Sequence, residues 1–359
     1  GADTIDGGAG SGDRADYFNS PDGVDVDLIT GVAVDGFGTT DSLTGIENIR
    51  GSENDDNLRG DNVVNKLDGR GGNDFLRGRG GDDIIDGGDG RDWADYRGAP
   101  TTVVVTLTDN TGSGHTGGSS SGAHGNDTLI DIENIRGGDG DDSLTGNASS
   151  NFLRGGLGAE ALDGRDGFDY ADYSNATTGV TANLANSGLN AGEAAGDTYA
   201  NLEGLRGADF ADTLIGDAGD NRLDGRDGGD VLDGGIGTDI ASYRTSGVGV
   251  TADLSNTANN TGFAFGDSYT SIEGLQGSNF DDILTGDAND NILIGGGGAD
   301  ALDGGAGFDT ASYRVNDIDF GVTIDLGNIA SNRGDAFGDT YTSIEAFEGS
   351  RLNDNMLSL

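Results

Sequence analysis

A nine-residue frame runs through this chain without insertions and constrains its fold more than any other feature. From residue 51 to residue 95 the chain reads GSENDDNLR, GDNVVNKLD, GRGGNDFLR, GRGGDDIID and GGDGRDWAD. Every row begins with glycine, carries an acidic or amide residue at the sixth position and usually an aliphatic residue at the eighth. The order predicts a glycine turn, an oxygen ligand and a short strand in each row.

The same frame returns as four consecutive rows at 137–172, 207–242 and 277–312. So many rows in register cannot be explained by glycine-rich composition alone. Rows such as GGDGRDWAD, GGIGTDIAS and GGAGFDTAS resemble the RTX (hemolysin-type) nonapeptide, a calcium-binding repeat. The resemblance implies an all-β fold, a right-handed parallel β-roll or β-helix solenoid, with wider spacer coils between the repeat blocks.

Composition indicates that this chain needs a cation in order to fold. Only 33% of its 359 residues are apolar, 70 are glycine, and the net charge is −45. Burial of so little apolar surface does not offset chain entropy and self-repulsion. With 64 acidic residues against 19 basic ones, nucleic acid and anionic membranes are poor partners, and we expect no membrane insertion. The absence of cysteine excludes disulfides.

A longer period lies above the nine-residue one, marked by ADY or ASY at Ala15, Ala94, Ala171, Ala241 and Ala311. Each spacer begins with a strand-like run, continues with a polar glycine-rich loop and ends with a second run. The predicted segments are a block end at 1–17, blocks at 51–95, 137–172, 207–242 and 277–312, a block start at 349–359, and spacers at 18–50, 96–136, 173–206, 243–276 and 313–348. We expect the spacers to continue the solenoid; separate small subdomains are the alternative. We also expect the chain to be part of a longer array.

Two rows would form one coil, so residues eighteen apart would lie one strand spacing apart, about 4.8 Å. The sixth-position carboxylates would then stack in two columns, with Asp56, Asp74 and Asp92 in one column of the first block and Asn65 and Asp83 in the other. Carboxylates at this spacing repel unless a divalent ion lies between them. Ca²⁺ accepts six to eight oxygens in loose geometry, whereas Mg²⁺ demands a tighter octahedron. We therefore predict multiple Ca²⁺ ions.

The acidic or amide ligands that the resemblance implies are Asp56, Asp74, Asp83, Asp92, Asp142, Glu160, Asp169, Asp212, Asn221, Asp230, Asp239, Asp282, Asn291, Asp300 and Asp309. The predicted turn glycines are Gly72, Gly81, Gly88, Gly90, Gly138, Gly140, Gly156, Gly158, Gly167, Gly228, Gly235, Gly237, Gly296, Gly298, Gly305 and Gly307. The second row of each block carries asparagine, namely Asn65, Asn151, Asn221 or Asn291. We expect these rows to be weak or half-formed sites, and the longer Glu160 and the frame-shifted Asp13 to be weaker candidates.

Several periodic spacer residues have a structural and a functional interpretation. For Tyr17, Tyr96, Tyr173, Tyr243 and Tyr313 we expect packing over the end coil rather than sugar stacking. For Asp41, Asp127, Asp197, Asp267 and Asp339 an extra calcium site and a plain turn remain equally open. For Glu47, Glu133, Glu203, Glu273 and Glu345 we favour a hydrogen bond or a salt bridge to Arg50, Arg136 or Arg206 over a ligand role. His115 and His124 are expected in a solvated loop.

The chain has neither an HExxH motif nor a P-loop, and we predict no enzymatic activity. The leading hypothesis is a calcium-dependent structural or adhesive array of a secreted or surface-attached bacterial protein. Resemblance to RTX proteins implies export by type I secretion and folding in extracellular calcium. Two alternatives remain: a secretion and folding appendage of an enzyme or toxin whose active domain lies elsewhere, and a module that binds polysaccharide or matrix components.

Overall fold

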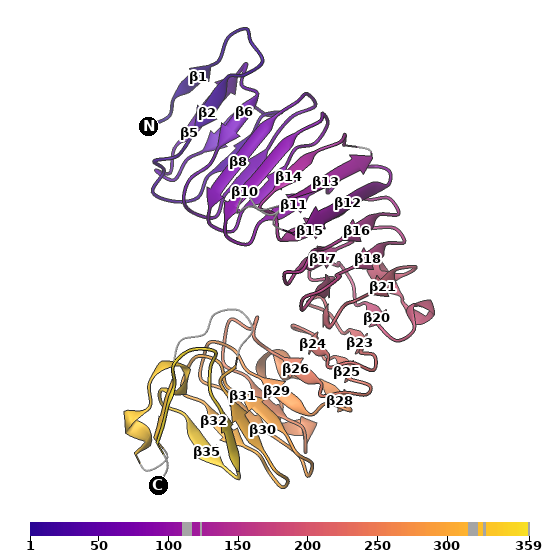
Figure 1. Ribbon diagram of the computed structural model, residues 1–359, viewed down its shortest axis with the longest axis vertical. Coiled ribbons are helices and arrows are strands. Elements are labelled where there is room, and N and C mark those ends of the chain that lie inside the picture. Colours follow the sequence, from indigo (N-terminus) through magenta and orange to yellow (C-terminus); the bar gives the residue numbers. More distant parts are fainter. Residues whose placement is uncertain (110–116, 123, 315–321, 326–327, 358–359) are drawn as a thin grey trace. The chain divides into compact units, whose positions relative to one another are not determined.

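The computed structural model describes residues 1–109, 117–122, 124–314, 322–325 and 328–357. Short strands in parallel ladders dominate these residues, and the helical elements among them are six 3-10 helices of three residues each (Figure 1). The chain divides into two compact units, one of residues 1–172 with 196–202 and the other of residues 173–195 with 203–359. The predicted all-β parallel roll is confirmed.

The first unit contains the strands β1 (Thr4–Asp6), β2 (Arg14–Asp16), β3 (Asp25–Asp27), β4 (Val32–Val34), β5 (Thr40–Thr44), β6 (Asn48–Arg50), β7 (Asn57–Arg59), β8 (Lys66–Gly71), β9 (Phe75–Arg77), β10 (Ile84–Asp89), β11 (Trp93–Asp95), β12 (Val103–Thr108), β13 (Gly117–Gly122), β14 (Thr128–Ile130), β15 (Asn134–Arg136), β16 (Ser143–Thr145), β17 (Phe152–Arg154), β18 (Ala161–Asp163), β19 (Tyr170–Asp172) and β21 (Thr198–Ala200).

The second unit contains the strands β20 (Thr181–Asn183), β22 (Gly204–Arg206), β23 (Thr213–Ile215), β24 (Arg222–Asp224), β25 (Val231–Asp233), β26 (Ile240–Ser242), β27 (Thr251–Asp253), β28 (Ser268–Thr270), β29 (Gly274–Gln276), β30 (Ile283–Thr285), β31 (Ile292–Ile294), β32 (Ala301–Asp303), β33 (Thr310–Ser312), β34 (Thr323–Asp325), β35 (Thr340–Thr342), β36 (Ala346–Glu348) and β37 (Asn355–Leu357). Its 3-10 helices are η1 (Ser187–Leu189), η2 (Gly192–Ala194), η3 (Thr257–Asn259), η4 (Gly262–Ala264), η5 (Ile329–Ser331) and η6 (Gly334–Ala336).

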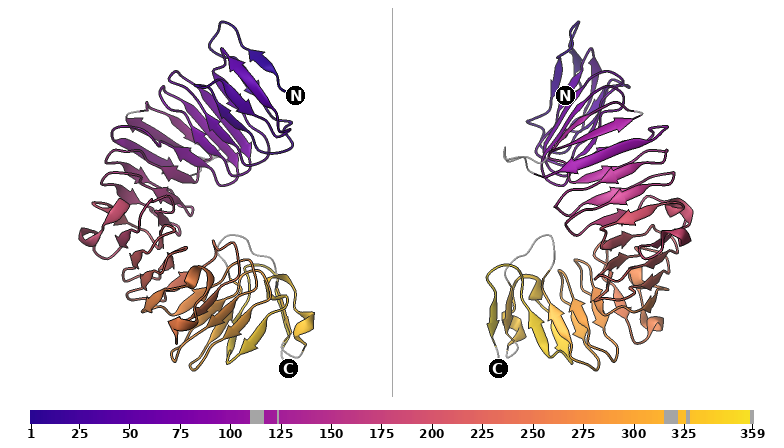
Figure 2. Two further views of the ribbon diagram at one scale, coloured as in Figure 1. Left: turned by 180° about the vertical axis from the view of Figure 1, so that it is seen from behind. Right: turned by 45° about the vertical axis from the view of Figure 1, so that its right-hand side comes forward.

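Within the repeat blocks, strands pair in parallel with the strand eighteen residues away. Leu58 of β7 lies opposite Leu76 of β9, and Leu67 of β8 lies opposite Ile85 of β10. In the second unit, Leu205 of β22 lies opposite Leu223 of β24 in the same way. Two nine-residue rows therefore form one coil, as predicted, and Figure 2 shows the stacked strands of each unit from two further sides.

The eighth residue of each row points into the roll and forms its core. Leu58, Leu67, Leu76, Ile85 and Ala94 are at most 1% exposed, and the equivalent residues of the other blocks are buried as well. Their neighbours at the seventh and ninth positions lie on the outer face because side chains alternate along a strand. The core is thus a narrow ladder of aliphatic side chains.

The first strand of each spacer also belongs to a ladder. β3, β12, β20, β27 and β34 each pair in parallel with the first strand of the block that follows. Leu326, at the end of the last predicted run, lies outside the described residues. The predicted strand-like runs are therefore strands, and each one adjoins its block by backbone hydrogen bonds.

The spacer loops differ from the prediction of irregular polar segments. β13 pairs antiparallel with both β12 and β14, although its sequence is GGSSSG. Its central Ser120 is 5% exposed and donates to Asp127 Oδ2 at 2.9 Å, so this G-x-S-x-G sequence lies in a strand and not in a nucleophile elbow. The loop prediction was therefore wrong for Gly117–Gly122, whereas His124 lies in the turn that follows. His124 is half-buried, and this burial lowers the pKa of its imidazole. His115 lies outside the described residues.

Candidate metal centre

The sixth residue of each row lies at the turn just before a strand, and its carboxylate reaches toward the neighbouring coil. The N–H of Asp56 donates to Asp74 Oδ1 at 2.8 Å, and the N–H of Asp74 donates to Asp92 Oδ1 at the same distance. In the second unit the N–H of Asp212 donates to Asp230 Oδ1 at 2.8 Å. These bonds hold the acids in one predicted column, and the N–H of Asn65 donates to Asp83 Oδ1 at 2.8 Å in the other.

This arrangement leaves the second oxygen of many carboxylates inside the protein without a donor. The oxygens that are buried and accept no hydrogen bond from the described residues are Oδ2 of Asp74, Asp83, Asp92, Asp230, Asp239, Asp300 and Asp309, and both carboxylate oxygens of Glu160. The side chains concerned are at most 1% exposed. A buried carboxylate oxygen without a partner is costly, so these atoms call for a cation.

Main-chain oxygens of the neighbouring coil surround the same carboxylates. A β-carbon added at Gly158 would lie 2.5 Å from Glu160 Oε1 and 2.6 Å from the Gly140 carbonyl oxygen. One added at Gly69 would collide with Asp74 Oδ2 and lie 2.7 Å from the Gly87 carbonyl oxygen. The missing side chain of glycine therefore leaves space that is bordered by carboxylate and carbonyl oxygens together, the donor set that Ca²⁺ accepts.

The electrostatics of the columns also favour a cation. Burial, with the carboxylates of Asp92 and Asp56 adding to it, raises the pKa of Asp74 to about 8. Burial and the carboxylate of Asp267 raise the pKa of Asp230 to about 8, and burial raises the pKa of Asp239 to about 6. A raised pKa means that the ionised form is destabilised, and a divalent ion nearby would reverse this penalty.

No group of three or more histidine, cysteine, aspartate or glutamate side chains that could hold a metal is found in the described part of the chain. A bound ion would therefore depend on turn carbonyls as well as on the columns' carboxylates. This mixture suits Ca²⁺, which takes carbonyl oxygens readily, better than Zn²⁺, which prefers nitrogen and sulfur ligands.

A family model of the RTX calcium-binding nonapeptide repeat matches the chain in four copies, at residues 63–94, 133–171, 206–241 and 276–311. The four repeat blocks of this chain are RTX nonapeptide repeats. Its blocks bind Ca²⁺ as members of that family. No match was found among curated proteins.

The predicted RTX turn glycines are of two kinds. Most have φ in the left-handed region, among them Gly72, Gly81, Gly88, Gly90, Gly156, Gly158, Gly167, Gly235, Gly237, Gly296, Gly298, Gly305 and Gly307. Gly138, Gly140 and Gly228 do not have positive φ, and Gly229 adopts it in place of Gly228. The sequence also gave no sign that Arg70, Arg79, Arg165 and Arg226 would adopt positive φ at the second position of their rows.

The predicted RTX ligands also differ in their hydrogen bonding. Asp83 and Asp169 accept from the N–H groups of Asn65 and Asn151, and Asp239 and Asp309 accept from those of Asn221 and Asn291. Both oxygens of Asp56, Asp142, Asp212 and Asp282 accept from protein groups. The carboxylates of a block are therefore not equivalent.

Spacer acids terminate the RTX columns, which the sequence did not reveal. Asp127, Asp197, Asp267 and Asp339 accept from the N–H of the last acid of one column. The backbone N–H of the last acid in the other column donates to a spacer glutamate, namely Glu47, Glu133, Glu273 or Glu345. The predicted hydrogen bond is thus confirmed for these four glutamates, but Arg50 pairs with Asp16 and Asp68, so its predicted salt bridge to the spacer glutamate was wrong.

The spacer tyrosines complete these column ends. Tyr17, Tyr96, Tyr173, Tyr243 and Tyr313 are all less than 9% exposed, which confirms the packing interpretation. The hydroxyl of Tyr243 donates to Asp267 Oδ2 at 2.7 Å, and that of Tyr313 donates to Asp339 Oδ2 at 2.6 Å. Both oxygens of these two spacer aspartates therefore have protein donors, as a turn or capping residue requires.

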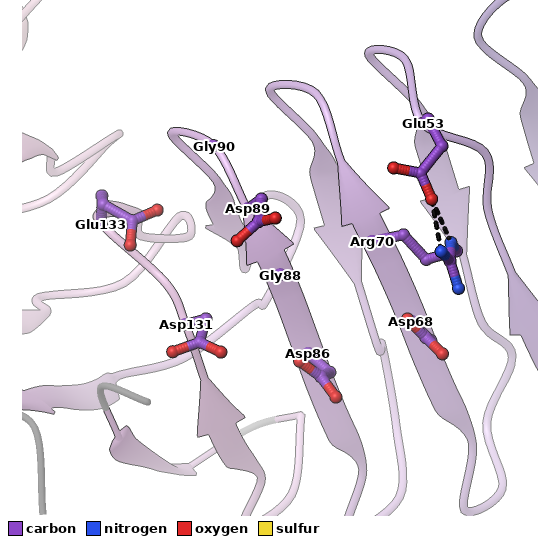
Figure 3. A pocket seen from close by; sticks show the side chains of 9 residues that line it. All are labelled: Glu53, Asp68, Arg70, Asp86, Gly88, Asp89, Gly90, Asp131 and Glu133. Atoms are coloured by element: carbon purple, nitrogen blue, oxygen red, sulfur yellow. Dashed lines mark hydrogen bonds and ion pairs between the residues drawn. The ribbon is translucent and has the colours of Figure 1, made fainter. Parts of the chain in front are cut away.

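An acidic groove of about 440 Å³ runs along the first RTX block to the spacer that follows it (Figure 3). It is lined by Glu53, Asp68, Arg70, Asp86, Gly88, Asp89, Gly90, Asp131 and Glu133. Arg70 Nε donates to Glu53 at 2.9 Å, and Asp68 and Asp86 lie in register on neighbouring strands. The predicted turn glycines Gly88 and Gly90 therefore border a surface rich in carboxylates.

Proposed function

We propose that this RTX region folds when it binds extracellular Ca²⁺ and then serves as a non-catalytic structural or adhesive array of a secreted or surface-attached bacterial protein. The observation that carries the proposal is the set of buried carboxylate oxygens without donors in the third and later rows. Without a cation these oxygens oppose folding, and with one they become ligands. Folding and calcium binding are then a single equilibrium.

In this proposal the ion would be held by acids of the third and later rows of a block, such as Asp74 and Asp92, together with carbonyl oxygens of the glycine turns. Bound Ca²⁺ supplies positive charge between coils that otherwise carry like charges. At a calcium concentration ten times the dissociation constant, each site stabilises the fold by about 1.4 kcal/mol. Several such sites together equal the stability of an ordinary domain.

The array role is supported by the higher-order repetition of spacer and block, and the extracellular location by the secreted character of the RTX family. In the described residues no helix is long and apolar enough to cross a membrane. We prefer an array to a sugar-binding module because the recurrent spacer tyrosines are buried, and the hydroxyls of Tyr243 and Tyr313 donate to spacer aspartates. Immunodetection of the chain in the medium and on the surface of producing cells tests the location.

The coupling of folding to calcium is tested by circular dichroism of the full chain. We expect a partial loss of strand signal and a lower thermal midpoint in chelator, and the recovery of both as Ca²⁺ is added, with little recovery at equal Mg²⁺. A chain that is equally folded in chelator, or that Mg²⁺ folds as well as Ca²⁺ does, contradicts the proposal. Equilibrium dialysis with radioactive calcium gives the number of ions bound.

A further inference from the structure

The first acid of every block is saturated by the protein itself. Asp56 Oδ1 accepts from the N–H of Val24 at 2.7 Å, and its Oδ2 accepts from the N–H of Ser52 at 2.6 Å. Asp282 accepts from the N–H groups of Val250 and Ser278 at 2.6 Å each. Val24 comes just before the spacer strand β3, and Val250 comes just before the spacer strand β27. These two strands pair with the first strand of the block that follows. The carboxylate thus fastens the spacer strand to the block.

The asparagine of every second row uses its amide as a donor. Asn65 Nδ2 donates to the Glu47 carbonyl oxygen at 2.8 Å, while its Oδ1 accepts from the N–H of Asp61 at 2.8 Å. Asn151 repeats both bonds, to the Glu133 carbonyl oxygen at 2.7 Å and from the N–H of Asn147 at 2.8 Å. A carboxylate cannot donate, so aspartate would set two oxygens against each other here.

The pattern changes between the second and third rows. From the third row onward, each of the acids Asp74, Asp83, Asp92, Asp230, Asp239, Asp300 and Asp309 accepts one N–H from the preceding coil and keeps a buried oxygen without a donor from the described residues. The change falls at the same row in the first, third and fourth blocks. In the second block, Glu160 of the third row has no donor for either carboxylate oxygen.

We propose that each block is divided into a leading pair of rows, which its own hydrogen bonds hold without calcium, and trailing rows, which alone take the ions. In the leading pair, the first-row aspartate and the second-row asparagine are positioning residues that join the spacer strand to the block. The leading pair and its spacer strand form a preformed edge, and calcium orders the trailing rows on it. This inference rests on the proposed function and assigns its ions to particular rows.

Asn65→Asp and Asp74→Asn test this division. It predicts that the first substitution lowers the thermal midpoint in chelator and that the second raises it, although the two residues lie only nine positions apart. Asn65→Asp should lower the thermal midpoint both in chelator and in calcium, with the number of bound ions unchanged. Asp74→Asn keeps the bond from the Asp56 N–H and removes a buried charge. It should raise the midpoint in chelator and reduce the ion count or weaken calcium binding by tenfold or more.

The opposite outcome is equally clear. If the second row is a weak calcium site, Asn65→Asp would tighten calcium binding or add an ion, and the division would be overturned. The same holds if Asp74→Asn leaves the ion count and affinity unchanged. Asn291→Asp and Asp300→Asn repeat the pair in the fourth block.

Asp282→Asn is a milder substitution that still tests the division if Asn65→Asp and Asn291→Asp fail to fold. It retains one acceptor oxygen and should lower the midpoint without changing the ion count, whereas the loss of an ion would contradict the proposal. The failure of the wild-type chain to bind Ca²⁺ would refute the proposed function itself. Calcium binding by the wild type with a gain of an ion in Asn65→Asp would refute only the division into rows.

Discussion

The N–H of Asp74 donates to Oδ1 of Asp92, eighteen residues later, at 2.8 Å. This bond fixes one carboxylate oxygen against the neighbouring coil and leaves the other free to bind an ion. Repetition of the bond along a column therefore sets the spacing of the carboxylate oxygens that an ion would bind.

The glycine that begins each row should be intolerant of even one methyl group. A β-carbon at Gly225 would collide with Asp230 Oδ2 and lie 2.7 Å from Asp230 Cγ, so Gly225→Ala must displace that carboxylate. We expect a loss of about 1–3 kcal/mol in the free energy of unfolding and a higher calcium midpoint. Gly247→Ala is the matched control, because no atom lies within 4 Å of its β-carbon. Equal effects of the two substitutions would contradict this steric explanation.

Stability in the absence of calcium should fall as the pH rises. Burial raises the pKa of Asp74, Asp230 and Asp300 to about 8, whereas the unfolded carboxylates titrate near 3.8. The folded chain therefore binds more protons than the unfolded chain between these values, and the stabilisation is complete below pH 4 and lost as the pH rises through 8. Denaturant unfolding in chelator at pH 5 and pH 8 should show higher stability at pH 5. Higher stability at pH 8 would show that these carboxylates are not buried when calcium is absent.

The periodic part of this structure was predictable, because a fixed repeat converts sequence distance directly into distance in space. Leu58 and Leu76 lie opposite each other for that reason, as do the acids Asp74 and Asp92. What the period could not reveal are bonds to spacer residues. Asp56 Oδ1 accepts from the N–H of Val24, thirty-two positions away, and the N–H of Asp92 donates to Glu133 Oε2, forty-one positions away. Spacer lengths vary, so no sequence interval specifies such contacts.

Arg154 and Asp172 should contribute more to stability than an exposed ion pair does. Their side chains are 9% and 1% exposed, and Arg154 Nη2 lies 2.6 Å from Asp172 Oδ2. Arg154→Met removes this charged partner from a buried carboxylate and should cost about 3 kcal/mol. Arg14→Met is the control, since Arg14 and Asp16 are 50% and 36% exposed and such pairs contribute under about 1 kcal/mol. Thermal unfolding in saturating calcium measures both, and similar losses would contradict the role of burial.

The tyrosine hydroxyls at the column ends should stabilise the fold in proportion to their hydrogen bonds. Tyr243 donates to Asp267 at 2.7 Å and lies 2.5 Å from the Tyr269 hydroxyl, within a site where burial raises the pKa of Asp267 to about 6. Tyr243→Phe keeps the ring but leaves that carboxylate with one donor fewer, so it should cost about 2 kcal/mol.

Two equivalent tyrosines provide the comparison for Tyr243→Phe. Tyr313→Phe should match it, because Tyr313 makes the same bond to Asp339 at 2.6 Å. Tyr17→Phe should cost less than about 1 kcal/mol, because its hydroxyl lies 3.5 Å from Asp41 Oδ2, at the limit of a hydrogen bond. Thermal unfolding of the three variants in calcium gives the order. If Tyr17→Phe were as costly as Tyr243→Phe, the effect would not come from the hydrogen bond to the spacer aspartate, and these aspartates would not act as caps of the columns.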